Sequence, residues 1–541
     1  MVQFVLVFGL LTLVLVLLRG NLLWTGRMLN PDEAELMAEG RTASLDLFPY
    51  SGYTSSTHLF LWPFVLGVLD LVGVPMTMVT AHVLGGLSYV FVSTTGWFLM
   101  MRRIGALRAA LLVLPPATVL LMGYGRIDGA IDFLSMTSES LSMVILSVSA
   151  LVLLGPTRPM STRQLVAGSL VAGLAVWAKP QSGPIAVAFI AACVLIACVE
   201  NGPSAERVRL GDVSRSILRS GLVAMLAFVT PTLVFVGVMA LGGTLDDLVR
   251  EPLAAMWNYT AHRDMSEGFV APAFSDRVTD VARFTLAFPF AAAWALGALL
   301  HLPLLERFGP PWLRGLGVVA ILLPMAAAVA TLWPVHPLFT HYANFLYLGC
   351  LFASCVAVRL AVPGQQEPLS GRPVELACVA VCVAVVAALL VVRIPATVDR
   401  LTTTDDPLVS SETNPDATSL SAACPAGSRV LVWGWASELY ASNDWTPASR
   451  YVNATWQIFP NRRQAEWSSI LRDELRQDPP ACIVEALGPD FFYDVDPSST
   501  ISSVVPGVSS LLESCYAKSA AKTVDDKSVT LYRRTGSCAV D

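Results

Sequence analysis

The chain has 541 residues, of which 54% are apolar and only 14% are charged, and its mean hydropathy is +0.61. Soluble domains are about one quarter charged, so this composition excludes an ordinary soluble enzyme, and the abundant apolar surface excludes a mostly disordered chain. The net charge of −6, with no basic block, excludes nucleic acid as a partner.

Long apolar runs fill the first 394 residues. A helix needs about 20 apolar residues to cross a bilayer core. The first run has no charged segment ahead of it and no small-residue cleavage site before Arg19, so we expect an uncleaved anchor. In chain order the runs predict eleven spanning helices, near 2–18, 79–101, 106–122, 141–155, 164–178, 183–199, 217–241, 283–302, 312–332, 342–362 and 374–394.

A further apolar run at 59–74 is ambiguous, because it contains Asp70 and is interrupted by Pro63. Short connectors between the other runs carry arginine residues, which favour the cytoplasmic side of a membrane. If all these connectors are cytoplasmic, 59–74 does not cross and forms a juxtamembrane or re-entrant helix at the outer surface. If it does cross, Arg102 and Arg103 fall on the wrong side or the N-terminus is outside. We favour the version that does not cross.

This topology describes a multi-pass protein of the plasma membrane with a cytoplasmic N-terminus. Nucleotide-activated substrates are not available on the outer side, and the sequence contains no glycine-rich phosphate loop. The outer side receives nearly all polar residues suited to chemistry, on 19–78, 123–140, 179–182, 242–282, 333–341 and 395–541.

Two adjacent carboxylates, Asp32 and Glu33, follow the first span. A carboxylate with restricted hydration at a membrane surface can have a raised pKa and act as a general base. The alternative is a helix start, since Pro31 followed by acidic residues suits the positive end of a helix dipole, and the two interpretations are compatible. Side chains that could bind a polyol or cap the next helix follow at Tyr53, Thr54, Ser55 and His58.

Ionisable residues also occur at the predicted bilayer edge, where they are costly and tend to be functional or paired. Arg126 and Asp128 lie in the second external segment and could form a purely structural pair, and Glu139 could simply cap the next helix. Lys179 ends an apolar helix, where a cation is favoured electrostatically, and it would also suit a lipid phosphate.

Later external segments add histidine and aromatic residues. His262 and Arg263 lie among aromatic rings at 242–282, which suits sugar and phosphate contact, although an amphipathic helix resting on the bilayer is the alternative. His341 and Tyr342 precede the tenth span. A second histidine five residues earlier is only weak evidence for a metal site.

The charge balance changes along the chain. Residues 1–394 carry 23 basic and 22 acidic residues, whereas 395–541 carry 12 and 19. We therefore expect a membrane domain and a separate extracytoplasmic α/β domain. Its strand-like runs are 429–433, 482–486 and 528–533, and its helical runs are 463–476 and 508–516.

Cysteine and tryptophan residues mark this second domain. Four cysteines in an oxidising compartment suggest two disulfides among three connectivities, and we favour Cys424–Cys482 and Cys515–Cys538. Trp433 and Trp435 could contact carbohydrate or form an aromatic core.

Together these residues resemble the GT-C superfamily, whose members are polytopic glycosyltransferases that use polyprenyl-phosphate sugars on the outer membrane face. Asp32-Glu33 is similar to its acidic motif in the first external loop, and Asp128 resembles the second-loop acidic position of aminoarabinose and protein mannosyl transferases. His341-Tyr342 is similar to a late His-Tyr pair of bacterial members. The stretches 53–56 and 137–140 resemble segments of arabinofuranosyl transferases, although those enzymes carry a different acidic pair in the first external loop.

The resemblance implies an inverting transfer of a sugar from a polyprenyl phosphate to an external hydroxyl of a glycan, lipid or protein of the cell envelope. Asp32 would be the base and Glu33 its support. A divalent cation (Mg²⁺, Mn²⁺ or Ca²⁺) held by Asp32 and Asp128 is a further alternative. The rival interpretations are a transporter or flippase of envelope precursors and a non-catalytic scaffold that binds a wall polymer.

Two groups of binding residues complete this hypothesis. Contact with the donor phosphate and sugar is expected from Arg126, Asp128, Glu139, Lys179, His262, Arg263, His341 and Tyr342. Contact with the acceptor is expected from Tyr53, Thr54, Ser55, His58, Trp433 and Trp435.

Overall fold

The computed structural model describes most of the membrane helices and most of the second domain. The described residues are 2–24, 26, 28–55, 58–106, 108–110, 112–113, 117, 135–155, 159–201, 210–256, 274–287, 311–333, 340–361, 417–458, 463–488, 496–522 and 528–536.

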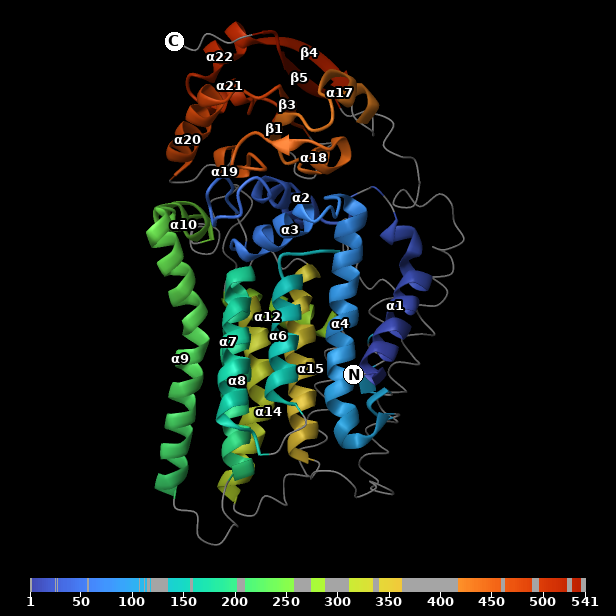
Figure 1. Ribbon diagram of the computed structural model, residues 1–541, viewed down its shortest axis with the longest axis vertical. Helices are drawn as coiled ribbons and strands as arrows, with labels where there is room; N and C mark the ends of the chain where they lie inside the picture. The colour runs from blue at the N-terminus through green and yellow to red at the C-terminus, as the bar shows by residue number, and fades with distance from the viewer. Residues whose placement is uncertain are drawn as a thin grey trace.

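A bundle of long helices forms the larger part of the molecule (Figure 1). In chain order these helices are α1 (Val2–Leu23), α4 (Met78–Ile104), α6 (Ser140–Leu153), α7 (Thr162–Ala178), α8 (Gly183–Asn201), α9 (Leu210–Gly242), α14 (Pro311–Leu332) and α15 (Ala343–Ala361). Each coincides with a predicted span. The other predicted spans, 106–122, 283–302 and 374–394, lie mostly outside the described residues.

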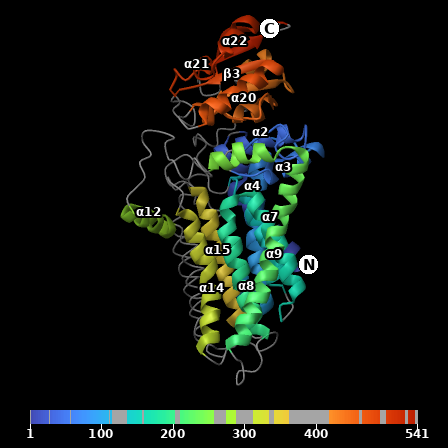
Figure 2. The ribbon, with the colours of Figure 1, turned by 90° about the vertical axis from the view of Figure 1, so that its left-hand side faces the viewer.

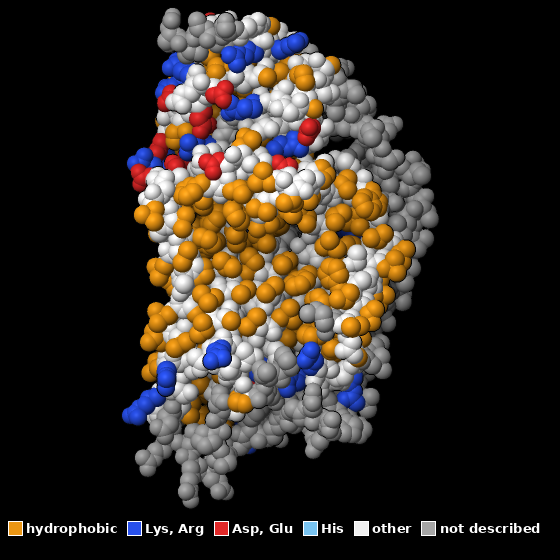
Figure 3. Space-filling model, in the orientation of Figure 1, with side chains coloured by type: hydrophobic (Ala, Val, Ile, Leu, Met, Phe, Trp, Pro, Cys, Tyr) orange, Lys and Arg blue, Asp and Glu red, His pale blue; other side chains and the backbone are white. Residues whose placement is uncertain are grey.

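The composition of these helices fits a lipid environment. Among the described residues, five helical stretches are long and apolar enough to cross a membrane, namely Met78–Ile104, Pro180–Glu200, Val213–Gly242, Trp312–Leu332 and Ala343–Leu360. Hydrophobic side chains cover the middle of the bundle, and Lys and Arg gather at its lower end (Figure 3). On α9, Leu226 and Leu233 are 61% and 67% exposed, which suits lipid rather than water. The protein is therefore a membrane protein.

Small residues allow some of these helices to pack closely. A Cβ added to Gly173 of α7 would lie 2.2 Å from the carbonyl oxygen of Phe228 in α9. A Cβ added to Gly349 of α15 would lie 2.6 Å from the carbonyl oxygen of Pro324 in α14. Glycine lets backbones approach at such crossings, where dispersion contacts hold membrane helices together.

Short helices lie across the upper end of the bundle, beneath the second domain (Figure 1). They are α2 (Pro31–Ala43), α3 (Leu61–Leu71), α10 (Leu245–Leu248) and a π-helical turn at Val249–Leu253. The eleven residues of α3 extend only about 17 Å, too short for a bilayer core of about 30 Å. This length agrees with the interpretation of 59–74 as a segment that does not cross.

Three further short elements border this layer. The 3-10 turns Pro180–Ser182 and Thr340–Tyr342 precede α8 and α15. The helix α12 (Phe274–Ala287) lies beside the bundle (Figure 2). Its Arg277 is buried and donates a hydrogen bond of 2.9 Å from Nε to the carbonyl oxygen of Trp333 at the end of α14.

The second domain is built on a five-stranded mixed sheet. Its order is β2-β1-β3-β5-β4, with β1 parallel to β2 and β3, and with β5 antiparallel to β3 and β4. The strands are β1 (Arg429–Gly434), β2 (Thr446–Pro447), β3 (Cys482–Ala486), β4 (Tyr516–Lys522) and β5 (Ser528–Arg534). The helices are α17 (Ala417–Ala423), α18 (Glu438–Asn443), α19 (Thr455–Ile458), α20 (Gln464–Gln477), α21 (Ile501–Val504) and α22 (Val508–Cys515).

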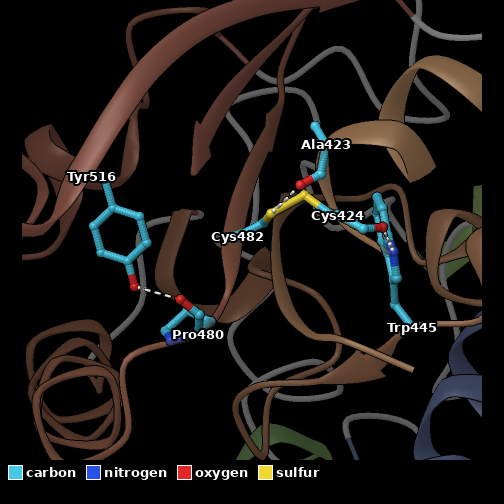
Figure 4. Close-up of a disulfide and its surroundings, with 6 residues drawn as sticks. All are labelled: Ala423, Cys424, Trp445, Pro480, Cys482 and Tyr516. Atoms are coloured by element: carbon cyan, nitrogen blue, oxygen red, sulfur yellow. Dashed lines mark hydrogen bonds between the residues drawn. A yellow bond between two sulfur atoms is a disulfide. The ribbon is translucent and has the colours of Figure 1, made fainter. Parts of the chain in front are cut away.

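A disulfide between Cys424 and Cys482 joins the end of α17 to the start of β3 (Figure 4). Trp445 packs beside it and donates a hydrogen bond of 2.8 Å from Nε1 to the carbonyl oxygen of Cys424. This is one of the two predicted pairs. Cys515 is also disulfide-bonded, and its predicted partner Cys538 lies outside the described residues.

The predicted acceptor role of Trp433 is wrong. Its side chain is fully buried in β1, and its Nε1 donates a hydrogen bond of 2.8 Å to the carbonyl oxygen of Ser499. Trp433 therefore belongs to the domain core, where an amphipathic ring is fully used by packing and one hydrogen bond. Trp435 is partly exposed and lies just beyond the end of the same strand.

Ion pairs and hydrogen bonds connect the second domain to the short helices below it. Arg41 at the end of α2 pairs with Asp444 at 2.7 Å. Arg450 of the second domain pairs with Glu251 of the π-helical turn at 3.0 Å and with Glu474 of α20 at 2.6 Å. Attraction from these two carboxylates raises the pKa of Arg450 despite the opposing effect of burial. The two domains are thus held in a defined relative position.

Candidate functional site

The first external helix holds Asp32 at its N-terminus. Asn30 is the N-cap, and its side-chain Oδ1 accepts a hydrogen bond of 2.9 Å from the backbone N–H of Asp32. Pro31 occupies the first helical position, which its fixed φ suits. The predicted helix start is therefore present, and it holds the backbone of Asp32 in place.

Glu33 completes this cap. Its Oε2 accepts hydrogen bonds from the backbone N–H groups of Leu29 at 3.0 Å and Asn30 at 3.3 Å, and its Oε1 accepts one from Met136 at 3.0 Å. His82 Nε2 lies 3.2 Å from the same carboxylate, which is fully buried. Both oxygens of Glu33 are thus engaged by the protein, so the support that Glu33 gives to Asp32 is to hold the start of the helix that carries it.

Asp32 instead faces the start of α6. Its Oδ2 accepts hydrogen bonds from Ser138, at 3.2 Å from the backbone N–H and 3.0 Å from the hydroxyl. Lys179, at the end of α7, donates a hydrogen bond of 2.6 Å from Nζ to the same Ser138 Oγ. One serine hydroxyl therefore connects a half-buried carboxylate to a buried ammonium group.

Glu139 is the second carboxylate at this ammonium. Its Oε1 lies 3.2 Å from Lys179 Nζ. The side chain is fully buried, and Oε2 has no hydrogen-bond partner among the residues that the structure describes. A buried carboxylate oxygen without a donor is costly, which indicates a place for a ligand, water or ion.

His341, from the 3-10 turn Thr340–Tyr342, brings a fourth structural element to the cluster. One atom each of Asp32, Glu139 and His341 lie within 4.8 Å of one another. The His341 ring packs against Tyr342 with a centroid distance of 4.3 Å. Two carboxylates and an imidazole form a donor set that a divalent cation accepts, although the Lys179 ammonium already neutralises Glu139. The predicted metal ligand Asp128 lies outside the described residues.

The surrounding charges keep Asp32 ionised. Burial alone would raise the pKa of this carboxyl, but attraction from His341, Lys179 and His58 and the hydrogen bond from Ser138 N–H outweigh it. The pKa of Asp32 is therefore lowered. Such a carboxylate is too weak a base to deprotonate a free hydroxyl group. It can take the proton only during a reaction in which the hydroxyl oxygen forms a new bond and the hydroxyl thereby becomes more acidic.

A second polar pair lies further along α2. Glu39 Oε2 is 2.5 Å from His58 Nε2, and both side chains are buried. Burial raises the pKa of Glu39 well above its usual range, with repulsion from Asp32 adding to it, and burial lowers the pKa of His58 to about 4. Both shifts favour an uncharged pair, so His58 is neutral at physiological pH.

Three carboxylates of α2 share one helix face. Asp32, Glu35 and Glu39 are separated by three and four residues, a spacing that places side chains in one row. Glu35 lines a small cavity between the two domains, which we call the interdomain cavity, with a volume of about 20 Å³, enough for about one water molecule. Its other lining side chains include Ser55, Glu251, Tyr451, Trp456 and Trp467.

The predicted site residues lie in different parts of the structure. Asp32, Glu139, Lys179 and His341 converge, with Tyr342 beside them. Thr54 and Ser55 line the interdomain cavity, whereas Tyr53 is buried in an aromatic cluster with Tyr50. The donor-binding predictions outside the described residues are Arg126, Asp128, His262 and Arg263.

Several residues of the site were missed by sequence reasoning. Ser138 stood in a stretch interpreted as a helix cap, and its short hydroxyl gave no signal that it bridges Asp32 and Lys179. Glu35 was visible as the carboxylate one helical turn after Asp32. Nothing in the sequence indicated that Tyr451, Trp456 and Trp467 would face it across a domain interface.

Comparison with known proteins supplies the fold. No protein-family model matches the chain, and no curated protein matches its sequence. The structure is similar to that of ArnT from Cupriavidus metallidurans bound to undecaprenyl phosphate, with a TM-score of 0.53, 14% identity and 99% of each chain covered. The apo state of the same protein gives a TM-score of 0.51, 13% identity and 98% coverage of each chain.

An oligosaccharyltransferase from Archaeoglobus fulgidus is also similar, with a TM-score of 0.40 and 13% identity over 89% of this chain and 68% of that one. The two similarities over almost the whole chain show that the protein shares its overall fold with ArnT, in agreement with the fold that the resemblance of its sequence implies.

Proposed function

We propose that the protein is a membrane glycosyltransferase that moves a sugar from a polyprenyl-phosphate donor to a hydroxyl group of the cell envelope. The observation that carries this proposal is the bridge from Asp32 through Ser138 to Lys179. It brings a proton acceptor and a fixed cation together at the end of the helical bundle, where a lipid-linked substrate can reach both from the membrane.

Each group has a role in a single displacement. Asp32 takes the proton of the acceptor hydroxyl while its oxygen bonds to the anomeric carbon of the sugar. The bond from that carbon to the phosphate oxygen breaks, and its electron pair leaves with the polyprenyl phosphate. Lys179 stabilises the charge that develops on this phosphate. One base on one face of the sugar implies inversion at the anomeric carbon.

The two negative groups near Lys179 have different roles in this proposal. Asp32 faces the acceptor, and Glu139 holds the ammonium through the contact of 3.2 Å. An ammonium held by a buried partner is pre-oriented, so it needs little reorganisation when the phosphate becomes a leaving group. The resident cation is then Lys179 rather than a metal ion.

The upper end of the bundle is proposed to face outward. Arginines lie at the opposite ends of the helices, at Arg102 and Arg103 in the last turn of α4, Arg163 at the start of α7 and Arg314 at the start of α14. Basic residues favour the cytoplasmic side. The site and the second domain then lie on the extracytoplasmic side, where polyprenyl-phosphate sugars replace nucleotide sugars as donors.

The test is Asp32→Asn in the full-length protein reconstituted in lipid nanodiscs. Transfer from a panel of polyprenyl-phosphate hexoses and pentoses to envelope glycan extracts is followed by mass spectrometry. We expect turnover to fall about 10²- to 10⁴-fold, the usual contribution of a general base, while folding is retained. Asp70→Asn on α3 is the control and should keep wild-type turnover. Near-normal transfer by Asp32→Asn would remove Asp32 as the base.

A further inference from the structure

A chain of buried hydrogen bonds ends directly beside Ser138. The hydroxyl of Tyr89 in α4 donates to Oδ1 of Asn344 in the first turn of α15, and Asn344 Nδ2 donates a hydrogen bond of 3.2 Å to Oγ1 of Thr137. Thr137 immediately precedes Ser138, and all four side chains are fully buried. We propose that Asn344 is a positioning residue, which holds Ser138 where its hydroxyl makes the bridge to Lys179. The inference rests on the proposed glycosyl transfer and adds a residue that acts without touching a substrate.

Every polar group of Ser138 is engaged. Its backbone N–H and its hydroxyl donate to Oδ2 of Asp32 at 3.2 and 3.0 Å, and the hydroxyl accepts from Lys179 Nζ at 2.6 Å. Its carbonyl oxygen accepts a hydrogen bond of 3.1 Å from Nε1 of Trp62 in α3. Hydrogen bonds weaken steeply as their distance and angle depart from the optimum. A small shift of the Ser138 backbone would therefore weaken several of these contacts together.

The turn that opens α6 is fixed in two ways. The backbone N–H of Thr137 donates to Ser140 Oγ at 3.1 Å, and its carbonyl oxygen accepts from the backbone N–H of Ser140 at 3.0 Å. These local bonds set the shape of the turn, but they do not place it relative to other helices. The Asn344 amide ties the turn to α15, and the Tyr89 hydroxyl holds that amide with its N–H group toward Thr137.

Asn344 also relates two parts of the site to each other. It follows His341 by three residues at the start of α15, whereas Ser138 and Glu139 precede α6. The helices α4, α6 and α15 pack side by side in the bundle (Figure 1). Interhelical hydrogen bonds join membrane helices, and a buried network whose members are satisfied becomes rigid. The amide therefore fixes the ends of α6 and α15 that carry site residues.

A hydrogen bond one turn further along the same helices has a simpler role. Ser93 of α4 lies four residues after Tyr89, and Tyr347 of α15 lies three residues after Asn344. Their hydroxyl groups are buried and hydrogen-bonded to each other. This bond joins α4 to α15, whereas the Asn344 amide continues from α4 through α15 to the turn before Ser138. The two bonds are therefore a matched pair for experiment.

The experiment uses the full-length protein in lipid nanodiscs and has two readouts. Hydrogen–deuterium exchange of segment 135–141 reports the order of the turn without any substrate, and steady-state transfer gives kcat and the donor KM. Asn344→Leu removes both amide contacts at similar size, so exchange of this segment should become faster. We expect kcat to fall about 10- to 100-fold, the effect of a misplacement of roughly 1 Å. The donor KM should change little, because Lys179 keeps its charge and its partner Glu139.

Matched variants separate positioning from general helix packing. Tyr347→Phe removes a hydroxyl between the same two helices and should leave exchange of segment 135–141 and kcat unchanged. Thr137→Val removes the hydroxyl that Asn344 contacts and should act like Asn344→Leu. Thr137→Ser keeps that hydroxyl and should retain most of the wild-type turnover. If Asn344→Leu does not fold, Thr137→Val takes its place.

A double-mutant cycle tests whether Asn344 acts through Ser138. Asn344→Leu should lower kcat much less in a Ser138→Ala background than in the wild-type protein, because residues of one network are not additive. Two outcomes would overturn the inference. One is a pair of effects that simply multiply, and the other is an effect of Asn344→Leu and Thr137→Val no larger than that of Tyr347→Phe. Failure of the proposed function would appear as no transfer by the wild-type protein, and the exchange measurements would still test the positioning.

Discussion

The helical bundle buries a charged cluster at each end, and the two clusters differ in how completely their charges are matched. At the lower end, Arg359 of α15 donates to both oxygens of Glu200, at 2.9 and 2.8 Å, and to the carbonyl oxygens of Leu153 and Gly155. The remaining capacity of Glu200 is used by the backbone N–H of Met160 at 3.2 Å. Every strong group of this cluster has a protein partner.

The upper cluster is unbalanced. Asp32 and Glu139 share one ammonium group, that of Lys179, and Glu139 Oε2 has no partner among the described residues. Buried charges are stable only when they are paired and hydrogen-bonded, so an incomplete set indicates that a ligand completes it. The comparison separates a cluster that ties helix ends together from one that, in the function proposed above, is arranged for chemistry.

The strongest way to break this comparison is to remove one partner of the lower pair. Arg359→Met leaves Glu200 buried and unpaired and should destabilise the protein by about 3–5 kcal/mol. Turnover of the molecules that remain folded should be unchanged. Thermal unfolding in nanodiscs and activity per folded molecule are the measurements. The double variant Arg359→Met with Glu200→Gln should recover much of the stability. A change in turnover per folded molecule in either variant would contradict a purely structural role for the lower cluster.

Removing the upper ammonium should change the pH profile instead. Lys179 lowers the pKa of Asp32, so Lys179→Gln should raise that pKa. Because Asp32 must be deprotonated to act as a base, the loss of turnover on acidification should begin at a higher pH in the variant. The donor KM should also rise. The control Lys179→Arg keeps the charge and should keep the pH profile. If the acid limb of the profile does not move in Lys179→Gln, Lys179 does not influence the pKa of Asp32.

A smaller effect is expected from the neutral pair on α2. The folded pKa of Glu39 is raised, so the folded state holds its proton where the unfolded state has lost it, and stability falls as pH rises above the usual carboxyl range. Glu39→Gln removes this loss and should raise thermal stability at neutral pH more than at pH values below that range. His58 has a lowered pKa of about 4, so its contribution to stability falls as the pH drops below the usual histidine pKa. This contribution is present in both the wild-type protein and the Glu39→Gln variant.

Metal removal should have the smallest effect. If Lys179 is the resident cation, incubation with EDTA should leave wild-type turnover unchanged, although Asp32, Glu139 and His341 could together hold a divalent ion. Activity assays before and after chelation, with Mg²⁺, Mn²⁺ or Ca²⁺ added back, measure this. Loss of turnover that a metal restores would assign the cluster to a metal ion.

The sequence by itself determined the membrane domain, the strand-bearing second domain and the helix start at Asp32. These depend on local patterns: continuous apolar runs, alternating strands, and Pro31 with acidic residues in a first turn. The predicted strands at 429–433, 482–486 and 528–533 correspond to β1, β3 and β5 for the same reason.

Only the tertiary structure decided which carboxylate is available and what faces it. Asp32 and Glu33 look alike in sequence, yet the backbone of Leu29, Asn30 and Met136 occupies Glu33 and leaves Asp32 to Ser138. Contacts between residues more than a hundred positions apart leave no periodic signal, because they arise from how helices and domains pack. The same reason hid the interdomain cavity and buried Trp433 in the core.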